Sequence, residues 1–376
     1  MTMKAESVAL YVHIPFCVRK CKYCDFASFS GVDLFDRGRY IDALCQEIDS
    51  YKGRDLSVST IFFGGGTPSL LSADELQKIV AHINSAFEIL PDTEFTMEIN
   101  PGTVTEEKLL AYIAAGVNRI SIGLQSIHEN ELKKLGRIHD YEEFLECYNL
   151  VRRLGIKNVN VDLMYGIPDQ TEESFKKTLE EVIKLSPEHI SAYGLIIEEG
   201  TPFFSERESL DFPDEDSECN MYYLAADMLR EAGYFHYEIS NYAKSGLECR
   251  HNFTYWHNRD YIGVGLAAYS YFEGRRFGNT RDIHEYTSGV RVVDDEELSL
   301  DGTAFEFAML ALRLSEGFSL NEYREKFGVD FLDRRKEIIS RLADVGYLTT
   351  DGGRIRLTER GFYVSNSILG ELLLGY

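Results

Sequence analysis

The segment Tyr11-Val-His-Ile-Pro-Phe-Cys17-Val-Arg-Lys-Cys21-Lys-Tyr-Cys24-Asp-Phe26 holds three cysteines within eight residues. Three thiolates this close together can bind three of the four irons of a cubane [4Fe-4S] cluster, and the neighbouring sequence supplies no fourth ligand. The fourth iron then keeps a coordination position for another molecule. We therefore expect a cluster held by Cys17, Cys21 and Cys24, with one iron open.

A structural zinc site is the alternative interpretation of the triplet. Zinc takes four tetrahedral ligands, usually from two separated pairs, so His13 or the distant Cys45 would have to complete the set. The chain has seven cysteines in 376 residues, and chance rarely places three of them so close. The cluster is the preferred interpretation.

Length and composition predict a mixed α/β protein with one large and one small domain. Apolar residues make up 44% of the chain, which is ample for a core. No apolar run approaches the roughly 20 residues that cross a bilayer, and the N-terminus lacks a signal-peptide pattern. Thiolate ligands and an odd cysteine count suit a reducing compartment, so we expect a cytoplasmic protein.

The net charge of −23 argues against nucleic acid as the main partner, because binding to phosphates relies on lysine and arginine. A peripheral contact with an anionic membrane surface would have to be local.

Short β-branched or aromatic runs recur along the chain, with helical patterns between most of them. The expected strands are 8–14, 60–63, 94–99, 119–124, 158–164 and 189–197. The expected helices include 72–86, 105–115, 141–154 and 171–185. This alternation predicts parallel strands joined by right-handed crossovers.

Six such units predict an α/β fold that is a partial (β/α)6, TIM-like barrel. We divide the chain into a barrel over 1–240, a connecting segment over 241–300 and a C-terminal domain over 301–376. The first strand ends just before the cysteine loop. The cluster should therefore lie at the C-terminal ends of the strands, where α/β folds bind ligands.

Polar residues follow the ends of these strands. Glycines 64–66 precede Thr67 and allow a close approach of the backbone to a ligand. Glu98, Gln125 and Asp162 lie at or near the ends of three further strands, and Arg137 lies in a loop. Each alone could be a satisfied core hydrogen bond, but together they predict a convergent polar site.

The motifs Tyr-Val-His-Ile-Pro-Phe-Cys, Gly-Gly-Gly-Thr-Pro-Ser and Ser-Ile-Gly-Leu-Gln-Ser resemble the HemN/HemW branch of the radical S-adenosylmethionine (SAM) superfamily. The resemblance extends from about Val8 to the C-terminus and implies a cluster whose open iron chelates SAM. A carboxylate and an arginine suit such a ligand. We also place Phe26 beside the cofactors. The resemblance assigns SAM binding to Tyr11, Gly65, Gly66, Thr67, Glu98, Gln125, Arg137 and Asp162.

Two features distinguish the members of this branch. Oxygen-independent coproporphyrinogen III oxidases (HemN) typically carry a further cysteine where this chain has Phe26, and a longer N-terminal segment. Residues His251-Asn-Phe-Thr-Tyr-Trp256, with the only tryptophan of the chain, resemble a motif of the HemW haem chaperones. Histidine is a common axial haem ligand, so His251 is one haem-ligand candidate and Cys249 is the other.

The part of the chain from Asp301 has a different character. An amphipathic run at 305–314 and a helix at 331–345 precede a β-hairpin around Asp351-Gly352, which suggests a winged-helix-like α+β domain. Winged helices often bind DNA, so a regulator is one alternative function. Residues 301–376 hold twelve acidic and ten basic residues, and a DNA-binding domain is normally more basic.

The resemblance favours a haem chaperone that carries a SAM-binding cluster and hands haem to respiratory haem proteins. The main alternative is an oxygen-independent coproporphyrinogen III oxidase of porphyrin biosynthesis. Further possible partners are an electron donor and a second copy of the chain in a homodimer. His13 and His139 either line the SAM pocket or are satisfied local histidines, and the remaining cysteines, Cys45, Cys147 and Cys219, are expected to be buried.

Overall fold

The computed structural model describes residues 7–31, 34–333 and 335–374. Its centre is a run of six parallel strands, hydrogen-bonded to one another in chain order. The partial barrel expected from the alternation of strands and helices is confirmed. The six strands are β1 (Val8–Ile14), β4 (Ser57–Gly65), β5 (Glu88–Ile99), β6 (Arg119–Gln125), β7 (Asn158–Tyr165) and β8 (His189–Gly194).

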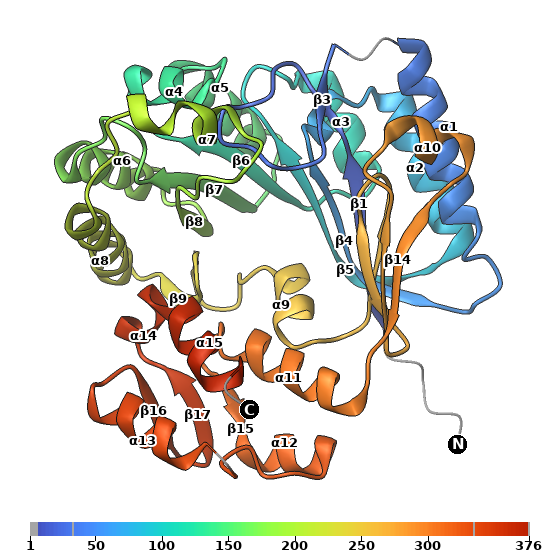
Figure 1. The fold of residues 1–376 in the computed structure, drawn as a ribbon. Coiled ribbons are helices and arrows are strands. Elements are labelled where there is room, and N and C mark those ends of the chain that lie inside the picture. The colour runs from blue at the N-terminus through green and yellow to red at the C-terminus, as the bar shows by residue number, and fades with distance from the viewer. Residues whose placement is uncertain (1–6, 32–33, 334, 375–376) are drawn as a thin grey trace.

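Helices connect these strands and cover the outer face of the sheet (Figure 1). Their starts follow from capping residues: Ser72 and Glu75 form a capping box at the start of α2, and Asp140 and Glu143 form another at α5. The helices are α1 (Leu34–Asp49), α2 (Ala73–Ala86), α3 (Glu106–Ala114), α4 (Glu129–Leu135), α5 (Tyr141–Arg153), α6 (Glu172–Leu185), α7 (Pro202–Glu206) and α8 (Glu215–Glu231).

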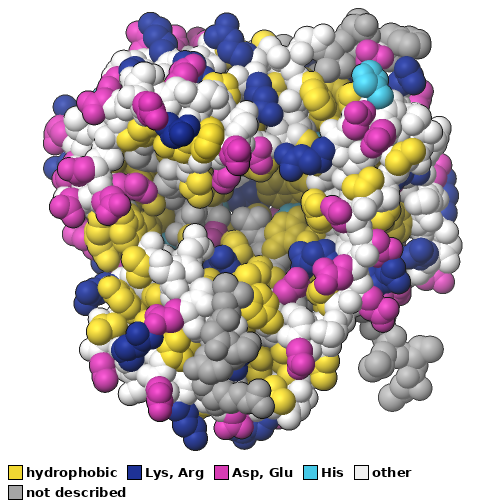
Figure 2. Space-filling model, viewed as in Figure 1, with side chains coloured by type: hydrophobic (Ala, Val, Ile, Leu, Met, Phe, Trp, Pro, Cys, Tyr) yellow, Lys and Arg dark blue, Asp and Glu magenta, His cyan; other side chains and the backbone are white. Residues whose placement is uncertain are grey.

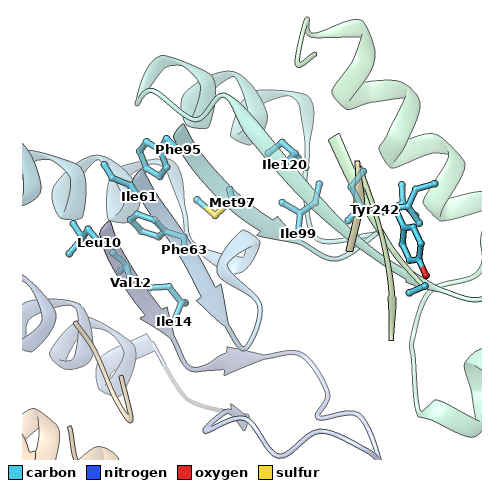
Figure 3. Packing of buried hydrophobic residues seen from close by; sticks show 14 of the residues in the cluster. Leu10, Val12, Ile14, Ile61, Phe63, Phe95, Met97, Ile99, Ile120 and Tyr242 are labelled. Atoms are coloured by element: carbon cyan, nitrogen blue, oxygen red, sulfur yellow. The ribbon is translucent and has the colours of Figure 1, made fainter. Parts of the chain in front are cut away.

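The core lies between the sheet and these helices. Alternate residues of each parallel strand are fully buried in it, and Figure 3 shows such side chains along β1, β4, β5 and β6. In β6 they are Ile120, Ile122 and Leu124. Because successive side chains of a strand point to opposite faces, Arg119 and Gln125 face the barrel interior instead. This face carries the polar residues of the site.

Further strands extend the sheet at both edges, to twelve in all within the described part of the chain. At one edge, β10 pairs with β8 and β9; at the other, β11 runs parallel to β1 and begins an antiparallel ribbon. A short β2–β3 pair flanks the cysteine loop. These elements are β2 (Phe16–Cys17), β3 (Phe29–Ser30), β9 (Phe235–Glu238), β10 (Asn241–Ala243), α9 (Arg250–Trp256), β11 (Tyr261–Val264), β12 (Tyr269–Phe272), β13 (Arg275–Asn279), α10 (Ile283–Ser288) and β14 (Val292–Glu297).

The C-terminal part packs helices around a three-stranded antiparallel sheet in the order β15-β17-β16 (Figure 1). The expected hairpin around Asp351-Gly352 is present as β16 and β17. The helix expected at 331–345 is shorter, and begins at Lys336. The elements are α11 (Leu300–Ala311), β15 (Phe318–Ser319), α12 (Leu320–Phe327), α13 (Lys336–Asp344), β16 (Leu348–Asp351), β17 (Arg354–Leu357), α14 (Glu359–Tyr363) and α15 (Ser365–Leu374).

Three strands differ from the expected ranges by three residues or more at one end, and the first of them, β4, begins at Ser57 rather than at 60. Strand β5 begins at Glu88, before Pro91, although proline lacks the N–H of a ladder hydrogen bond. A register shift between Val58 and Thr60 on the neighbouring strand accommodates this part of β5. Strand β8 ends at Gly194 rather than at 197. None of the described helices is long and apolar enough to cross a membrane.

Candidate cofactor and ligand site

A cavity of about 590 Å³ opens at the C-terminal ends of the parallel strands and reaches into the barrel interior. Figure 2 shows the molecule hollowed between the barrel and the C-terminal part. A volume of this size is typical of small-molecule sites. The expected site residues that line it are Cys17, Cys21, Cys24, Phe26, Gly65, Gly66, Thr67, Glu98, Gln125, Arg137, Asp162 and Cys249.

The cysteine loop is fixed by backbone hydrogen bonds to two other parts of the chain and by one bond between its own ends. Lys22 N donates to Leu135 O of α4 over 3.0 Å, and Phe203 N of α7 donates to Lys22 O over 3.1 Å. Phe29 N donates to Pro15 O over 2.7 Å. These contacts hold the three half-buried thiols at the mouth of the cavity.

Two of the thiols accept hydrogen bonds from one chain of polar side chains. Thr67 Oγ1 donates to Cys17 Sγ over 3.7 Å, and Asn100 Nδ2 donates to Thr67 Oγ1 over 3.0 Å. Arg137 donates from Nη2 to Asn100 Oδ1 over 3.0 Å and from Nη1 to Cys21 Sγ over 3.6 Å. Donors aimed at the sulfur atoms stabilise negative charge on thiolate ligands.

The thiols fit a cluster better than a single zinc ion. No three His, Cys, Asp or Glu side chains of the described residues converge on one point where an ion could bind. Each cysteine of a cubane binds a different iron, so convergence on one point is not needed. Of the two residues that could complete a zinc site, Cys45 is buried in α1, and His13 hydrogen-bonds to Tyr11 and to Ala27 O.

The glycines after β4 lie directly against the strand that leads into the cysteine loop. Gly65 has a φ of +108°, and a Cβ there would lie 2.4 Å from the His13 ring. A Cβ at Gly66 would lie 2.7 Å from Phe16 O. Tyr11 packs against Gly64 and is not among the cavity-lining residues of the described chain. Only glycine fits positions 65 and 66.

Two carboxyl groups face the cavity from neighbouring parts of the barrel. Gly65 N donates to Glu98 Oε2 over 3.3 Å. Burial, followed by repulsion from Asp162, raises the pKa of Glu98 to about 8. Burial also raises the pKa of Asp162, although Asn160 and Ser121 donate to its oxygens. A positively charged ligand beside these groups would favour their ionised forms.

Two expected SAM residues carry polar atoms that have no partner in the described chain. Gln125 Oε1 and Arg137 Nε are buried without a hydrogen bond. Gln125 also has a φ of +72°, a left-handed conformation that is costly outside glycine and often occurs at functional sites. Both residues line the cavity, so a polar ligand can satisfy them. The residues present therefore fit a ligand such as SAM.

Helix α9 carries the His251-to-Trp256 motif, and Glu94 of β5 binds its first turn. Glu94 accepts hydrogen bonds from Arg250 N over 3.2 Å and from His251 N over 3.1 Å. Free N–H groups and the helix dipole favour such a carboxylate at a helix start. Cys249 Sγ lies 3.6 Å from Glu94 Oε1. Glu94 thereby fixes the motif at the end of the barrel that is opposite to the cysteine loop.

His251 is buried, with both ring nitrogens hydrogen-bonded. Nδ1 lies 2.8 Å from Thr60 Oγ1, and Nε2 lies 2.8 Å from Tyr255 Oη. Burial, followed by the charge of Arg119, lowers the pKa of His251 to about 3, so the ring is neutral. His251 is not among the cavity-lining residues of the described chain. Axial ligation of haem iron by His251 would require one of these two bonds to break.

Cys249, the other haem-ligand candidate, does line the cavity. Burial raises the pKa of its thiol to about 12, so the free cysteine is protonated. Asn252, the second residue of the motif, also lines the cavity.

The other histidines and Phe26 lie near the cavity mouth. His139 Nε2 lies 3.3 Å from Leu124 O, in a small pocket beside Cys21 and Arg137. Burial lowers the pKa of His139 to about 4 and that of His13 to about 4. Phe26 is 67% exposed at the rim, and Ile196 is equally exposed near it. The rim is therefore partly apolar.

Sequence reasoning missed several cavity-lining residues. Arg119, Ser121 and Asn160 alternate with the core residues of β6 and β7, and this period of two was a usable signal. Asn241 comes from the segment after the barrel, and no local pattern predicts its position. Asn252 belongs to the His251-to-Trp256 motif, but the motif does not indicate which of its side chains faces the cavity.

Comparison with known proteins was made on this fold and site. The family model described as the radical SAM superfamily matches residues 11–182, and the HemN C-terminal domain model matches residues 298–364. The heme chaperone HemW of Escherichia coli is 38% identical over 99% of this chain and 99% of its own length. HemW of Lactococcus lactis is 35% identical over 97% of both.

A solved structure, coproporphyrinogen III oxidase (HemN) from Escherichia coli, superimposes with a TM-score of 0.86 over 98% of this chain and 91% of its own. At 22% identity this likeness shows the fold alone. Fold and cysteine loop together define a radical SAM protein with a HemN-type C-terminal domain. The chain belongs to the HemW family.

Proposed function

We propose that this protein is a haem chaperone: it binds haem beside a [4Fe-4S] cluster with SAM, and passes the haem to respiratory haem proteins. The relatives named heme chaperone match it over nearly their whole length. The observation that carries the proposal is one cavity lined both by the cysteine triplet and by the start of the His251-to-Trp256 segment. A ligand in it can contact both.

Cys17, Cys21 and Cys24 would hold the cluster, since their thiols share the cavity mouth. When bound, the cluster supplies an electron to SAM and an open iron that chelates its amino and carboxylate groups. Gly65 and Gly66 supply backbone to the cavity wall, and Glu98 and Asp162 would attract the positive charge of SAM. Gln125 and Arg137 offer their unpaired polar atoms. The chain thus orients SAM and shields it from water.

The inner wall suits the flat, largely apolar face of a porphyrin. Phe62, Tyr193 and Met164 supply apolar surface to the cavity, and Leu195 and Ile196 continue it toward the rim. Aromatic and thioether side chains pack well against flat rings. Polar side chains between them can meet the charged edge of the ligand.

His251 and Cys249 remain the two axial-ligand candidates. Cys249 faces the cavity as a thiol, and its proton must leave before iron can bind the sulfur. His251 is neutral, as a metal ligand must be. To bind iron, one of its ring nitrogens has to lose its hydrogen bond with the hydroxyl of Tyr255 or of Thr60. A His251→Ala variant that takes up haem with an unchanged absorption spectrum would remove His251 as the ligand.

A coproporphyrinogen III oxidase is the second candidate, because the cysteine loop opens onto the same cavity that would hold a tetrapyrrole. In such an enzyme, SAM-derived chemistry would remove hydrogen from propionate side chains before decarboxylation. Phe26, which stands where these oxidases typically have a further cysteine, disfavours the oxidase function.

One experiment separates the two functions. Anaerobically reconstituted protein is titrated with haem and followed by absorption, and the same sample is assayed with coproporphyrinogen III, SAM and a reductant. We expect stoichiometric haem binding, transfer of that haem to an apo haem protein and no protoporphyrinogen. Decarboxylated product without stable haem binding would overturn the proposal and favour the oxidase.

A further inference from the structure

The deep end of the cavity contains a buried arginine that forms no direct ion pair with any described residue, although the charges of Glu94 and Asp162 act on it. Arg119 is the first residue of β6, faces the barrel interior and lines the cavity, yet is only 2% exposed. Its Nε has no hydrogen-bond partner, and the guanidinium forms no salt bridge within the described part of the chain. Arginine stays protonated in proteins, so this position carries a buried positive charge.

The carboxylates nearest to Arg119 are bonded to other groups. Glu94 is held by the backbone at Arg250 and His251. Asp162 accepts hydrogen bonds from Asn160 and Ser121. A buried charge without a direct partner is costly, whereas an anion bound to it forms charge-assisted hydrogen bonds. This arrangement favours the binding of an anion beside Arg119.

The geometry of this site suits a carboxylate. The planar fork of arginine can donate two parallel hydrogen bonds to one carboxylate group. Asn252 lines the same cavity, and its side-chain amide can donate to a carboxylate that is already bound to arginine.

Two carboxylates are available in the proposed function, that of SAM and the propionates of the tetrapyrrole. The residues that fit SAM, such as Gln125, lie at the C-terminal end of β6, beside the cysteine loop. Arg119 lies at the opposite end of this strand, and the six residue steps between them span roughly 20 Å. A SAM molecule anchored at the cluster would not place its carboxylate there.

We propose that Arg119 binds a propionate carboxylate of the tetrapyrrole at the deep end of the cavity. This inference rests on the proposed function and extends it, because it assigns the orientation of the ligand: one propionate edge points inward, toward Arg119. The porphyrin face then lies along the apolar wall, and the opposite edge is closer to the cluster.

The test uses haem and haem dimethyl ester, in which both propionates are esterified and uncharged. The full-length, cluster-loaded protein is titrated with each ligand. We expect wild type to bind haem at least tenfold more tightly than the diester, since the ester cannot pair with the guanidinium. In Arg119→Gln this preference should fall to less than threefold, and Arg119→Lys should retain part of it. Arg291→Gln is the matched control, because Arg291 also has an unpaired Nε but is not among the cavity-lining residues described.

Each outcome has a separate meaning. Equal affinity of wild type for haem and diester overturns the inference alone, and this comparison holds even if Arg119→Gln fails to fold. A preference that persists unchanged in folded Arg119→Gln also overturns it. Loss of SAM affinity in Arg119→Gln with the haem preference intact would assign Arg119 to SAM instead. If wild type binds neither tetrapyrrole, the proposed function fails, and the inference fails with it.

Discussion

Arg137 donates a hydrogen bond from Nη1 to Cys21 Sγ over 3.6 Å, although Cys21 precedes it by 116 residues. The same guanidinium bonds to Asn100, which holds Thr67 and through it Cys17. One positive charge therefore links two of the three cysteines proposed to bind the cluster. We therefore expect Arg137 to affect the proposed cluster as well as SAM binding.

Replacement of Arg137 by glutamine should make the reduction potential of the cluster more negative. Reduction adds negative charge to the cluster and its sulfur ligands, and a nearby guanidinium stabilises that charge. The potential is measured by a redox titration followed by electron paramagnetic resonance. Arg152→Gln is the control, because Arg152 pairs with Glu188 on the outer face of the barrel. An unchanged potential in Arg137→Gln would show that the contact with Cys21 has no electrostatic effect.

The pH dependence of SAM binding should report Glu98. Its pKa is raised to about 8 without ligand, so at pH 6 or 7 the side chain is mostly protonated. A cationic ligand favours the ionised form, and binding must release the proton. The affinity for SAM should rise by about tenfold per pH unit below pH 8 and level off above it. Calorimetry on Glu98→Gln should give a nearly flat profile, and a wild-type profile that falls with rising pH would contradict the assignment.

Glu98 should also affect the stability of the protein without SAM. Between the unfolded pKa near 4.5 and the folded value of about 8, the native state holds a proton that the unfolded state releases. The free energy of unfolding therefore decreases as pH rises through this window. Urea unfolding should find Glu98→Gln more stable than wild type at pH 7.5 and of similar stability at pH 4. Equal stability of the variant and wild type at both pH values would mean that burial does not destabilise the ionised form of Glu98.

Haem ligation by His251 can be tested through Tyr255. Because Tyr255 Oη is hydrogen-bonded to Nε2 of His251, ligation of iron through Nε2 has to break this partly buried hydrogen bond. Such a bond contributes about 1 kcal/mol, so Tyr255→Phe should tighten haem binding roughly fivefold if His251 is the ligand. His251→Ala should then lose the histidine-type absorption spectrum. Tyr261→Phe, which removes a hydroxyl from the ring that packs against Tyr255, is the control. Haem affinity that is unchanged in Tyr255→Phe would favour Cys249.

The sequence predicted the parallel part of the fold because its signals are local. Most strands of the barrel contain a short apolar run and are followed by a helix with a capping residue, and the cysteine triplet follows the first strand. The edge strands were not predicted, since β11 and β12 have four residues each and β11 pairs with β1, about 250 residues away. Such pairing depends on the tertiary context.

The same limit applies to the site. Cys17, Glu98 and Gln125 could be predicted because they lie in motifs at strand ends, where ligands bind in parallel sheets. Arg119 lies at the start of its strand, and only closure of the barrel by α9 turns that end into the floor of a cavity. His251 shows the converse: its motif is recognisable, but its hydrogen bonds to Thr60 and Tyr255 depend on packing that the sequence does not reveal.

Gly65 gives a sharp test of how the cysteine loop is supported. A Cβ at this position would lie 2.4 Å from the His13 ring, and His13 Nε2 bonds to Ala27 O just beyond the loop. Gly65→Ala should therefore displace His13 and cost roughly 3 kcal/mol or more of unfolding free energy. Gly233→Ala is the matched control, because φ there is also positive, at +86°, with no atom within 4 Å. Backbone strain alone should make it cost about 1–2 kcal/mol.

Two further measurements connect this contact to the cluster. Gly65→Ala should bind less iron per chain after reconstitution than Gly233→Ala, because the loop loses its link through Ala27. The double variant Gly65→Ala/His13→Ala should be less destabilised than the sum of the two single variants, since removal of the ring makes room for the new methyl group. Additive costs together with full iron content in Gly65→Ala would mean that the ring moves aside freely. His13 would then have no part in holding the cysteine loop in place.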